Sequence, residues 1–315
     1  MNSMNILLRV DIDFSFCIRK GVPWLLDYFD KNGIKATFFS VMGPDTVSSH
    51  GKRIGKKGYI KRLISMNPLK MIWAFGPLFL LRGKLLPVSH VGKDNPDILK
   101  DIQARGHELG LHGYDHSWWA DNWKLLNSEG VLKEFARANN EYHKIFGTNS
   151  SLWGSPNWRT VEPLYDIMEN MNIKYSSNVR GNKPFLPKFS GKEKNVVELP
   201  ISLPAIHELV QYGIPKKSIP QTIKGCLDKS YNMLVIHGYY EGLLERELFK
   251  NTVDELLSAG YKFTTLGQYY DTIRNENIEA DGISQIRVPG GFGDVSCQED
   301  FLQNNYFDLL KGQND

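Results

Sequence analysis

The sequence has few cysteines and no long apolar run, and each of these absences excludes a class of protein. Only three cysteines occur in 315 residues, and they lie far apart: Cys17, Cys226 and Cys297. They form neither a C-x-x-C metal site nor a disulfide framework, so we expect a reducing compartment. No stretch reaches the roughly 18–20 apolar residues of a membrane-spanning helix, and the N-terminal apolar run is too short for a signal peptide. We therefore expect a cytoplasmic protein.

A strong charge of one sign is also missing. The formal net charge is +3 and the sequence pI is about 8.5. This balance does not indicate a nucleic-acid binder, although it permits approach to an anionic membrane surface. With 41% hydrophobic and 23% charged residues, the composition is that of a globular protein with a sizeable core.

Apolar segments of strand length alternate with segments of helix length. We expect strands at residues 6–10, 35–41, 108–111, 173–176, 196–203, 233–237 and 261–264. We expect helices at residues 22–32, 97–104, 128–145, 162–171 and 247–259. This alternation predicts an α/β fold with a parallel sheet and external helices, and the number of units favours a barrel.

Two regions interrupt this pattern. Residues 44–96 read as an insertion after the second strand, and they contain the apolar run MIWAFGPLFLL (residues 71–81) between cationic residues. Such a run is better suited to a membrane interface or to burial than to spanning a bilayer. The polar, glycine-rich residues 276–315 read as a C-terminal appendage to a main domain formed by residues 1–275.

Three groups of ionisable residues follow predicted strands. Asp11 and Asp13 end the first strand, His112 and His116 follow another, and His237 ends the apolar run MLVIH. In a barrel, the carboxyl ends of the strands form the mouth where catalytic groups gather. Histidines four apart share a face if the segment is helical, which suits two imidazoles on one metal.

Each group also has a structural interpretation when it is taken alone. The aspartates can form a solvated loop, the histidine pair can arise by chance among eight histidines, and His237 can be a hydrogen-bonded core residue. Their common position at strand ends favours an open metal site with one Asp and two His ligands.

The order of these motifs resembles the NodB-type polysaccharide deacetylases. The motifs are D-x-D (residues 11–13), GHELG followed by H-x-x-x-H (residues 106–116), and VIH (residues 235–237). Further segments are similar to the 4-deoxy-4-formamido-L-arabinose-phosphoundecaprenol deformylases, a branch linked to lipid A modification: RVDID (9–13), KGVP (20–23), GIKATFF (33–39), VMGPD (41–45) and LPISLP (199–204). The resemblance implies a distorted (β/α) barrel that binds a divalent metal, whether Zn, Mn or Co.

The resemblance also implies roles for the five residues. Asp13, His112 and His116 would bind the metal. Asp11 would be the general base that accepts a proton from the attacking water, and His237 would protonate the departing amine.

Other site residues follow from the same resemblance. Arg159, in the segment WGSPNWR, would orient the base carboxylate, or else it is a surface arginine. Trp158, Asn178, Arg180 and Lys183 would contact the substrate, with the last two reaching a phosphate. Asn178 stands where the deformylases are expected to have an aspartate, which leaves the identity of the amino sugar open.

A polyprenyl-phosphate-linked amino sugar keeps its tail in the bilayer, so the resemblance implies peripheral binding to the inner face of the cytoplasmic membrane. Trp73, Phe75, Leu78 and Phe79 are the expected membrane contacts, unless this run covers the barrel. A soluble polysaccharide or small-amide deacetylase and a non-catalytic carbohydrate- or lipid-binding barrel are the alternatives. The sequence does not define the number of subunits.

Overall fold

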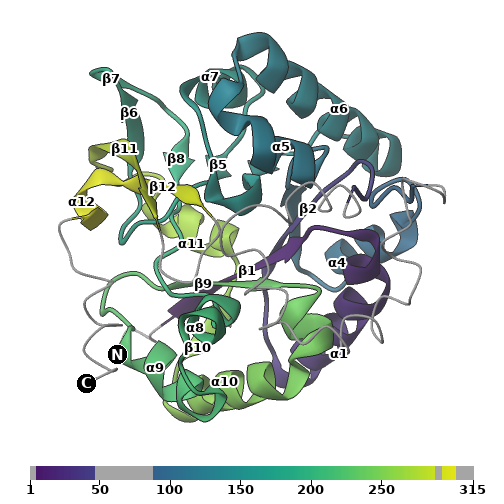
Figure 1. Ribbon diagram of the computed structural model, residues 1–315, viewed down its shortest axis with the longest axis vertical. Helices are drawn as coiled ribbons and strands as arrows, with labels where there is room; N and C mark the ends of the chain where they lie inside the picture. Colours follow the sequence, from purple (N-terminus) through teal and green to yellow (C-terminus); the bar gives the residue numbers. More distant parts are fainter. Residues whose placement is uncertain (1–4, 47–87, 288–292, 303–315) are drawn as a thin grey trace.

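The main sheet is mostly parallel and is built around one central strand. The computed structural model describes residues 5–46, 88–287 and 293–302. Within them, the main sheet has eight strands in the order β10-β1-β2-β3-β4-β5-β8, with β9 also paired to β1 (Figure 1). It curls into a half-barrel surrounded by helices, which confirms the predicted fold class.

The strand β1 (Asn5–Ile12) is buried along all but its first residue. It pairs in parallel with β10 through residues 5–7, with β2 through residues 9–12, and with β9 through residues 7–11. Leu7 and Arg9 each have two paired neighbours, so β9 lies on one side of β1 while β10 and β2 share the other. A strand enclosed in this way needs a nearly continuous apolar sequence, which explains why it was recognisable.

The remaining strands of the main sheet are β2 (Thr37–Ser40), β3 (Glu108–Leu111), β4 (Leu152–Trp153), β5 (Tyr175–Ser176), β8 (Val197–Glu198), β9 (Met233–His237) and β10 (Lys262–Thr264). The α-helices are α1 (Val22–Asn32), α4 (Pro96–Ala104), α5 (His116–Asn122), α6 (Ser128–Phe146), α7 (Glu162–Asn170), α8 (Ile206–Tyr212), α9 (Ile219–Gly225), α10 (Arg246–Ser258), α11 (Leu266–Ile273) and α12 (Glu299–Leu302). Two π-helical turns, η1 (Cys17–Gly21) and η7 (Tyr240–Leu244), follow β1 and β9.

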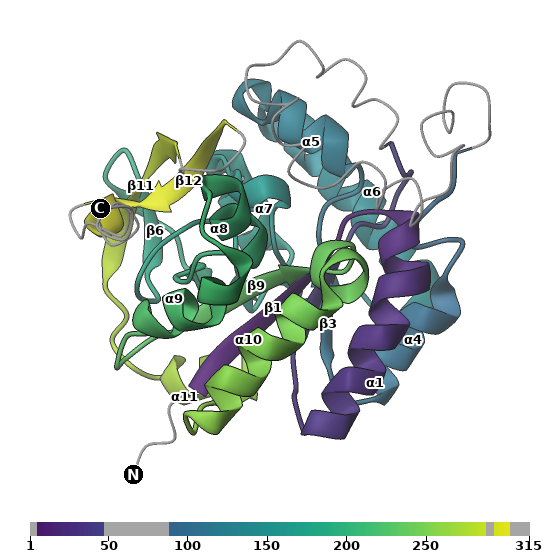
Figure 2. The same ribbon diagram turned by 60° about the horizontal axis from the view of Figure 1, so that its bottom comes forward.

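Helices α1 and α10 lie side by side along the sheet (Figure 2). The ring of Phe249 on α10 contacts both Trp24 and Tyr28 on α1. Helix α1 ends where Gly33 takes a left-handed conformation, with φ of 64°, a position that glycine occupies without a steric cost. This packing buries the outer face of the sheet and leaves the carboxyl ends of the strands to other segments.

A second sheet of four strands joins the C-terminal region to the body. Its order is β12 (Asp294–Gln298), β11 (Ala280–Arg287), β6 (Leu186–Phe189) and β7 (Lys192–Glu193). β11 pairs with β6 in parallel, and β12 also bridges Arg180 through Cys297. The predicted appendage is therefore packed on the body through two strands that its glycine-rich composition did not suggest.

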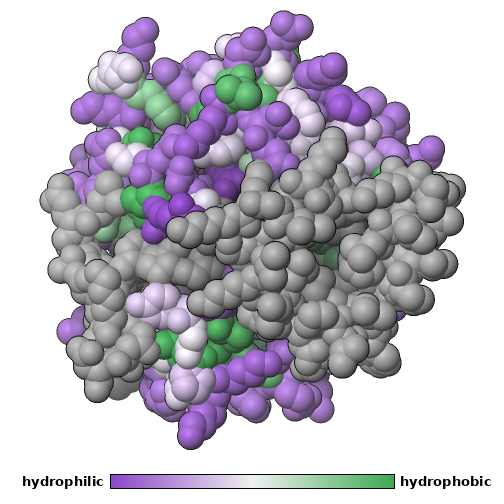
Figure 3. Space-filling view, viewed as in Figure 1, coloured by the Kyte–Doolittle hydropathy of each residue, from purple (hydrophilic) through white to green (hydrophobic). Residues whose placement is uncertain are grey.

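Within the described residues, no helix is long and apolar enough to cross a membrane. The described surface facing the viewer in Figure 3 is mostly hydrophilic and has only small hydrophobic patches. Among the described residues, the large exposed hydrophobic side chains are Trp118, Leu125, Leu132 and Met171. The predicted membrane contacts Trp73, Phe75, Leu78 and Phe79, like most of the predicted insertion, lie outside the described residues.

Candidate metal centre

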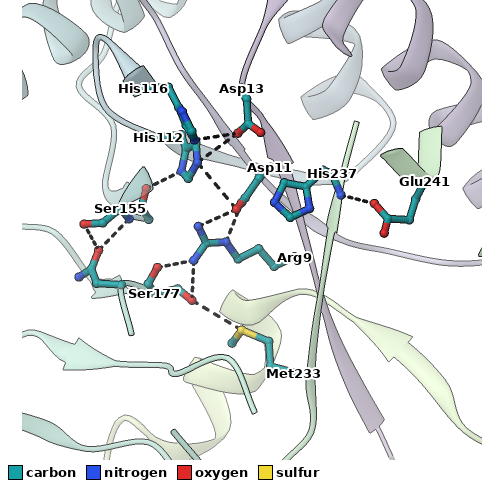
Figure 4. A network of polar contacts seen from close by, with 12 residues as sticks. Arg9, Asp11, Asp13, His112, His116, Ser155, Ser177, Met233, His237 and Glu241 are labelled. Atoms are coloured by element: carbon teal, nitrogen blue, oxygen red, sulfur yellow. Dashed lines mark hydrogen bonds and ion pairs between the residues drawn. The ribbon is translucent and has the colours of Figure 1, made fainter. Parts of the chain in front are cut away.

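Strand register brings the predicted catalytic residues to one edge of the main sheet. Asp11 on β1 is the Cα partner of His237 on β9, and paired positions direct their side chains to the same face of a sheet. His112 directly follows β3, and its backbone N–H donates to Ser40 at the end of β2. Strands β9, β1 and β3 therefore deliver these side chains to the same place, with β2 lying between β1 and β3 (Figure 4).

Asp13, His112 and His116 form the one cluster of potential metal ligands among the described residues, and all three are buried. Their ligand atoms lie within 4.8 Å of one another. Oδ1 of Asp13 is 3.3 Å from Nε2 of His112 and 3.6 Å from Nε2 of His116. Ligand atoms bound at about 2.0–2.2 Å in a tetrahedral site are about 3.4 Å apart, so these spacings suit one ion.

The bonding of this cluster also fits a metal. Oδ1 of Asp13 is buried and has no hydrogen-bond partner among the described residues. Nδ1 of His112 lies 2.7 Å from the carbonyl oxygen of Gly154. A proton on Nδ1 would be donated to that oxygen, which leaves the lone pair of Nε2 directed at Asp13. The donor set and its orientation therefore fit a divalent ion.

Electrostatics keep Asp13 ionised. Burial alone would raise the pKa of its carboxyl group, but the neighbouring imidazoles His116, His112 and His237 bring the pKa well below its usual range. An ionised carboxylate beside two imidazoles is the form that binds a cation.

The H-x-x-x-H spacing would place both histidines on one face if the segment were helical. In the structure the two histidines do not share a helix. Gly113 has a φ of 81°, which is not a helical conformation, so the chain turns after His112. Helix α5 begins only at His116. Asp115 caps this helix by accepting the N–H of Trp118. His112 therefore comes from a loop and His116 from the start of a helix, and their side chains meet at the same cluster.

Asp11 is held by an arginine from its own strand. Its two carboxylate oxygens accept from Nε and Nη2 of Arg9, at 2.7 and 3.0 Å. Arg9 is fully buried, donates also to the backbone oxygen and the hydroxyl of Ser177, and lies over the ring of Phe39. An arginine that makes two bonds to a carboxylate fixes its orientation.

Arg159 does not make the bond to Asp11 that the sequence suggested. Its guanidinium donates to the backbone oxygens of Asp294 and Ala120. The two preceding residues, Asn157 and Trp158, both have positive φ, and the chain reverses so that Arg159 is directed toward α5 and β12. The prediction that Arg159 orients Asp11 is therefore wrong, and Arg9 has this position instead. Arg9 was detectable from the sequence, because residues two apart on a strand share a face.

His237 is buried at the end of β9 and contacts other aromatic rings. Its ring centroid is 4.7 Å from that of His207 and 5.5 Å from that of Tyr239. Its backbone N–H donates to Oε2 of Glu241 in the turn η7, at 2.6 Å. Burial raises the pKa of Glu241 to about 8. Neither His207 nor Glu241 was among the predicted site residues.

The predicted substrate contacts mostly serve the protein itself. Asn178 is fully buried, where its side-chain oxygen accepts from Ser155 and its amide donates to Glu198. It is therefore not positioned to touch a sugar, because that network surrounds it. This corrects the expectation that its identity reads the amino sugar directly.

The two predicted phosphate contacts already have acidic partners. Arg180 is buried, pairs with Glu208 and lies over the ring of Trp158 at 4.1 Å. Lys183 is partly exposed and pairs with Glu279 and Asp300. Trp158 is itself only 6% exposed. A contact between Lys183 and the substrate stays a prediction. Burial of Arg180 disfavours a contact between its side chain and the substrate.

The polysaccharide deacetylase family model matches residues 8–176 of the chain. The protein of Wigglesworthia glossinidia brevipalpis named "Probable 4-deoxy-4-formamido-L-arabinose-phosphoundecaprenol deformylase ArnD" is 27% identical, over 90% of this chain and 98% of its own length. A Shewanella sediminis protein of the same name is also 27% identical, over 96% and 97%.

Solved structures support the fold. A structure from Mycobacterium smegmatis assigned as a polysaccharide deacetylase has a TM-score of 0.62 at 14% identity, covering 90% of this chain and 95% of that one. The Xyl-CE4 domain of a multidomain xylanase, from the hindgut metagenome of Trinervitermes trinervoides, has a TM-score of 0.50 at 14% identity, covering 92% and 100%.

Proposed function

Because the chain belongs to the polysaccharide deacetylase family, we propose that it removes the N-acyl group, formyl or acetyl, from an amino sugar carried on undecaprenyl phosphate. The enzyme is a hydrolase of amide bonds, in the class of sugar deformylases and deacetylases. Similarity to the two deformylases over nearly their whole length supports the lipid-linked substrate. The observation that carries the proposal is the buried cluster of Asp13, His112 and His116 beside Asp11 and His237.

Asp13, His112 and His116 would hold the divalent ion. When bound, such an ion supplies Lewis-acid chemistry, polarising the acyl oxygen and increasing the acidity of water. Zn, Mn and Co all suit one carboxylate and two imidazoles. Nδ1 of His112 faces the Gly154 oxygen, which sets the ring so that Nε2 faces Oδ1 of Asp13.

Asp11 is proposed to be the general base and His237 the general acid. As the water oxygen bonds to the acyl carbon, Asp11 takes one of the water's protons. The carbon–nitrogen bond then breaks, and His237 gives its proton to the nitrogen. Free amine and formic or acetic acid result. Asp11 and His237 occupy paired positions on neighbouring strands, so base and acid can act on one amide from two sides.

Arg9 prepares Asp11 for this role. Its two bonds hold the carboxylate in one orientation at the end of β1. The base is therefore ready before the substrate binds.

The direct test incubates the purified enzyme with undecaprenyl-phosphate amino sugars that carry formyl or acetyl groups. Mass spectrometry of the lipid identifies the group that is lost. We expect the wild type to convert one of these lipids and Asp11→Asn to convert neither. Release of acetate from soluble oligosaccharides, with none from the lipids, would support the soluble deacetylase instead. Binding without hydrolysis of any amide would support the non-catalytic barrel.

Metal content gives a second readout. His112→Ala and His116→Ala should each lose the ion that copurifies with the wild type, because either change leaves only two ligands. His143, an exposed histidine on α6, provides the matched control. His143→Ala should retain the ion, as measured by elemental analysis.

A further inference from the structure

His207 is a buried histidine next to the proposed acid that has no assigned role. It lies in the first turn of α8 and is 7% exposed. Its ring centroid is 4.7 Å from that of His237, with an interplanar angle of 85°. By comparison, the rings of His112 and His116 are 5.5 Å apart. The closest pair of imidazoles at this site therefore lies outside the proposed ligand set.

Aromatic rings fix the orientation of His207. Trp158 stacks on it, at 6.3 Å and 25°, and Tyr240 meets it edge-on, at 5.9 Å and 69°. Rings in such contacts have little rotational freedom, because neighbouring groups fill the space into which they would turn. His207 therefore presents a fixed surface to His237.

A buried ion pair fixes the start of α8. Oε2 of Glu208 accepts a hydrogen bond from the backbone N–H of Ala205, at 2.9 Å. The same oxygen forms an ion pair with the guanidinium of Arg180. The Arg180 guanidinium in turn lies over Trp158. The helix that carries His207 and the ring that stacks on it are thus joined through one arginine.

The perpendicular arrangement favours a single proton on the pair. The edge of an aromatic ring is electropositive and its face is electronegative. When the ring that presents its edge is protonated and the other is neutral, the contact is attractive, as in a cation–π interaction. Protonation of both rings would place two positive charges in contact within a buried site, which is unfavourable.

We propose that His207 is a positioning residue for the general acid, and that His207 and His237 form an imidazole pair that carries one proton. This inference rests on the proposed role of His237. His207 fixes the ring of His237 and, by remaining neutral, stabilises the protonated form of its partner. The pair returns to its starting state when it takes up a proton after the amine has left.

Several other titratable or charged groups face the pair. From the elements packed around it these are Asp11 and Asp13 near the end of β1, Tyr239, Tyr240 and Glu241 after β9, and Arg180 with Glu208 behind α8. The Arg180 and Glu208 charges compensate each other. None of these groups is altered by a substitution at position 207, so such a substitution isolates the effect of the second imidazole.

The kinetic test compares His207→Leu with His207→Asp. Leucine fills much of the space between Trp158 and Tyr240 but has no aromatic face to contact a protonated ring, so kcat should fall with little change in KM, and the alkaline limb of the rate profile should move to lower pH. Aspartate supplies a negative charge, so this limb should move up by about one pH unit. His143→Leu is the control with wild-type kinetics. If both position-207 variants keep the wild-type limb, His207 does not act on the proton donor.

A spectroscopic test does not depend on turnover. The experiment uses the zinc-loaded full-length protein with histidine labelled with carbon-13 at Cε1. The chemical shift of His207 should change with pH as His237 gains or loses its proton. This change should be absent in His237→Phe. An unchanged His207 titration in that variant would overturn the pair. Coupled signals in a protein that hydrolyses no lipid-linked amide would overturn the proposed function and leave the pair intact.

Discussion

At the scale of single residues, the site depends on how Arg9 and Asp11 are placed along one strand. Both lie on β1, and residues two apart on a strand direct their side chains to the same face. Their bidentate pairing is therefore local and is formed whenever β1 forms. The sequence contained this information, but Arg159 was more conspicuous because it followed a recognisable motif.

Substitution of Arg9 tests this arrangement. Arg9→Lys keeps the charge but cannot make two parallel bonds to Asp11, so Asp11 should lose its fixed orientation. We expect kcat/KM to fall roughly 10- to 100-fold, as is typical when a group that orients an active-site ligand is changed. Arg159→Lys is the matched control, since Arg159 binds backbone oxygens near α5 and β12. A larger loss for Arg159→Lys than for Arg9→Lys would reverse these assignments.

Glu241 should make stability depend on pH. Burial raises the pKa of its carboxyl group from 4.5 to about 8, so between these values the folded protein binds a proton that the unfolded chain releases. The free energy of unfolding contributed by this group is therefore greatest at low pH and decreases as pH rises through about 8. Glu241→Gln cannot ionise, so its urea midpoint should change less between pH 5 and 8.5 than that of the wild type. Parallel curves for the two proteins would contradict this role.

At the scale of secondary structure, the bounds of long apolar segments were predictable, and the bounds of short segments were not. The predicted bounds of α1, β3 and β9 agree with the structure. Strands β4, β5 and β8 have only two residues each, too few to show a period. No strand was predicted at β4, and the strands predicted at residues 173–176 and 196–203 extend beyond β5 and β8. Their positions are set by pairing with neighbours that are distant in sequence, and no local pattern encodes such pairing.

The two π-helical turns show a further limit of sequence patterns. η1 and η7 follow the strands that carry Asp11 and His237, and they meet where Gly21 approaches Gly238. π-Helical turns are rare and are often found at functional sites. The spacing of apolar residues in the sequence does not predict these π-helical turns.

Gly21→Ala tests this contact. A Cβ at position 21 would lie 1.9 Å from the backbone oxygen of Gly238, so one of the two turns must move. We expect a loss of about 2–3 kcal/mol in the free energy of unfolding and a drop in kcat as His237 shifts. Gly225→Ala, at the end of α9, is the control, because its Cβ would meet nothing within 4 Å. Equal urea midpoints for both variants would show that the turns tolerate the displacement.

At the scale of the whole molecule, the C-terminal region supports the loops around the site. The backbone of Arg180 pairs on both sides of Cys297 in β12, and Arg159 donates to the Asp294 oxygen. We propose that residues 1–275 are the catalytic unit and that residues 276–315 brace it. The glycine-rich sequence suggested an appendage without its strands, because composition does not reveal which strand a segment will join.

The described residues at the start of the predicted insertion bond to residues next to the metal ligands. Asp45 accepts the backbone N–H of Ser15, two residues after Asp13, and Thr46 donates to Asp115, which precedes His116. The bridge between Pro44 and His90 closes the base of the insertion. A lipid-linked substrate would need contact with the membrane at this edge of the sheet.

We therefore expect the aromatic residues of the insertion to control membrane binding. Replacing Trp73 and Phe75 with serine should reduce flotation with anionic liposomes and raise KM for a lipid-linked substrate, while kcat for a short soluble amide stays unchanged, because apolar anchoring and the chemistry are separate. Met171→Ser is the control: it follows α7, which returns the chain to the amino ends of the strands, opposite the metal cluster. If the double variant instead loses stability with no change in flotation, the run is part of the core and the substrate must reach the site by another route.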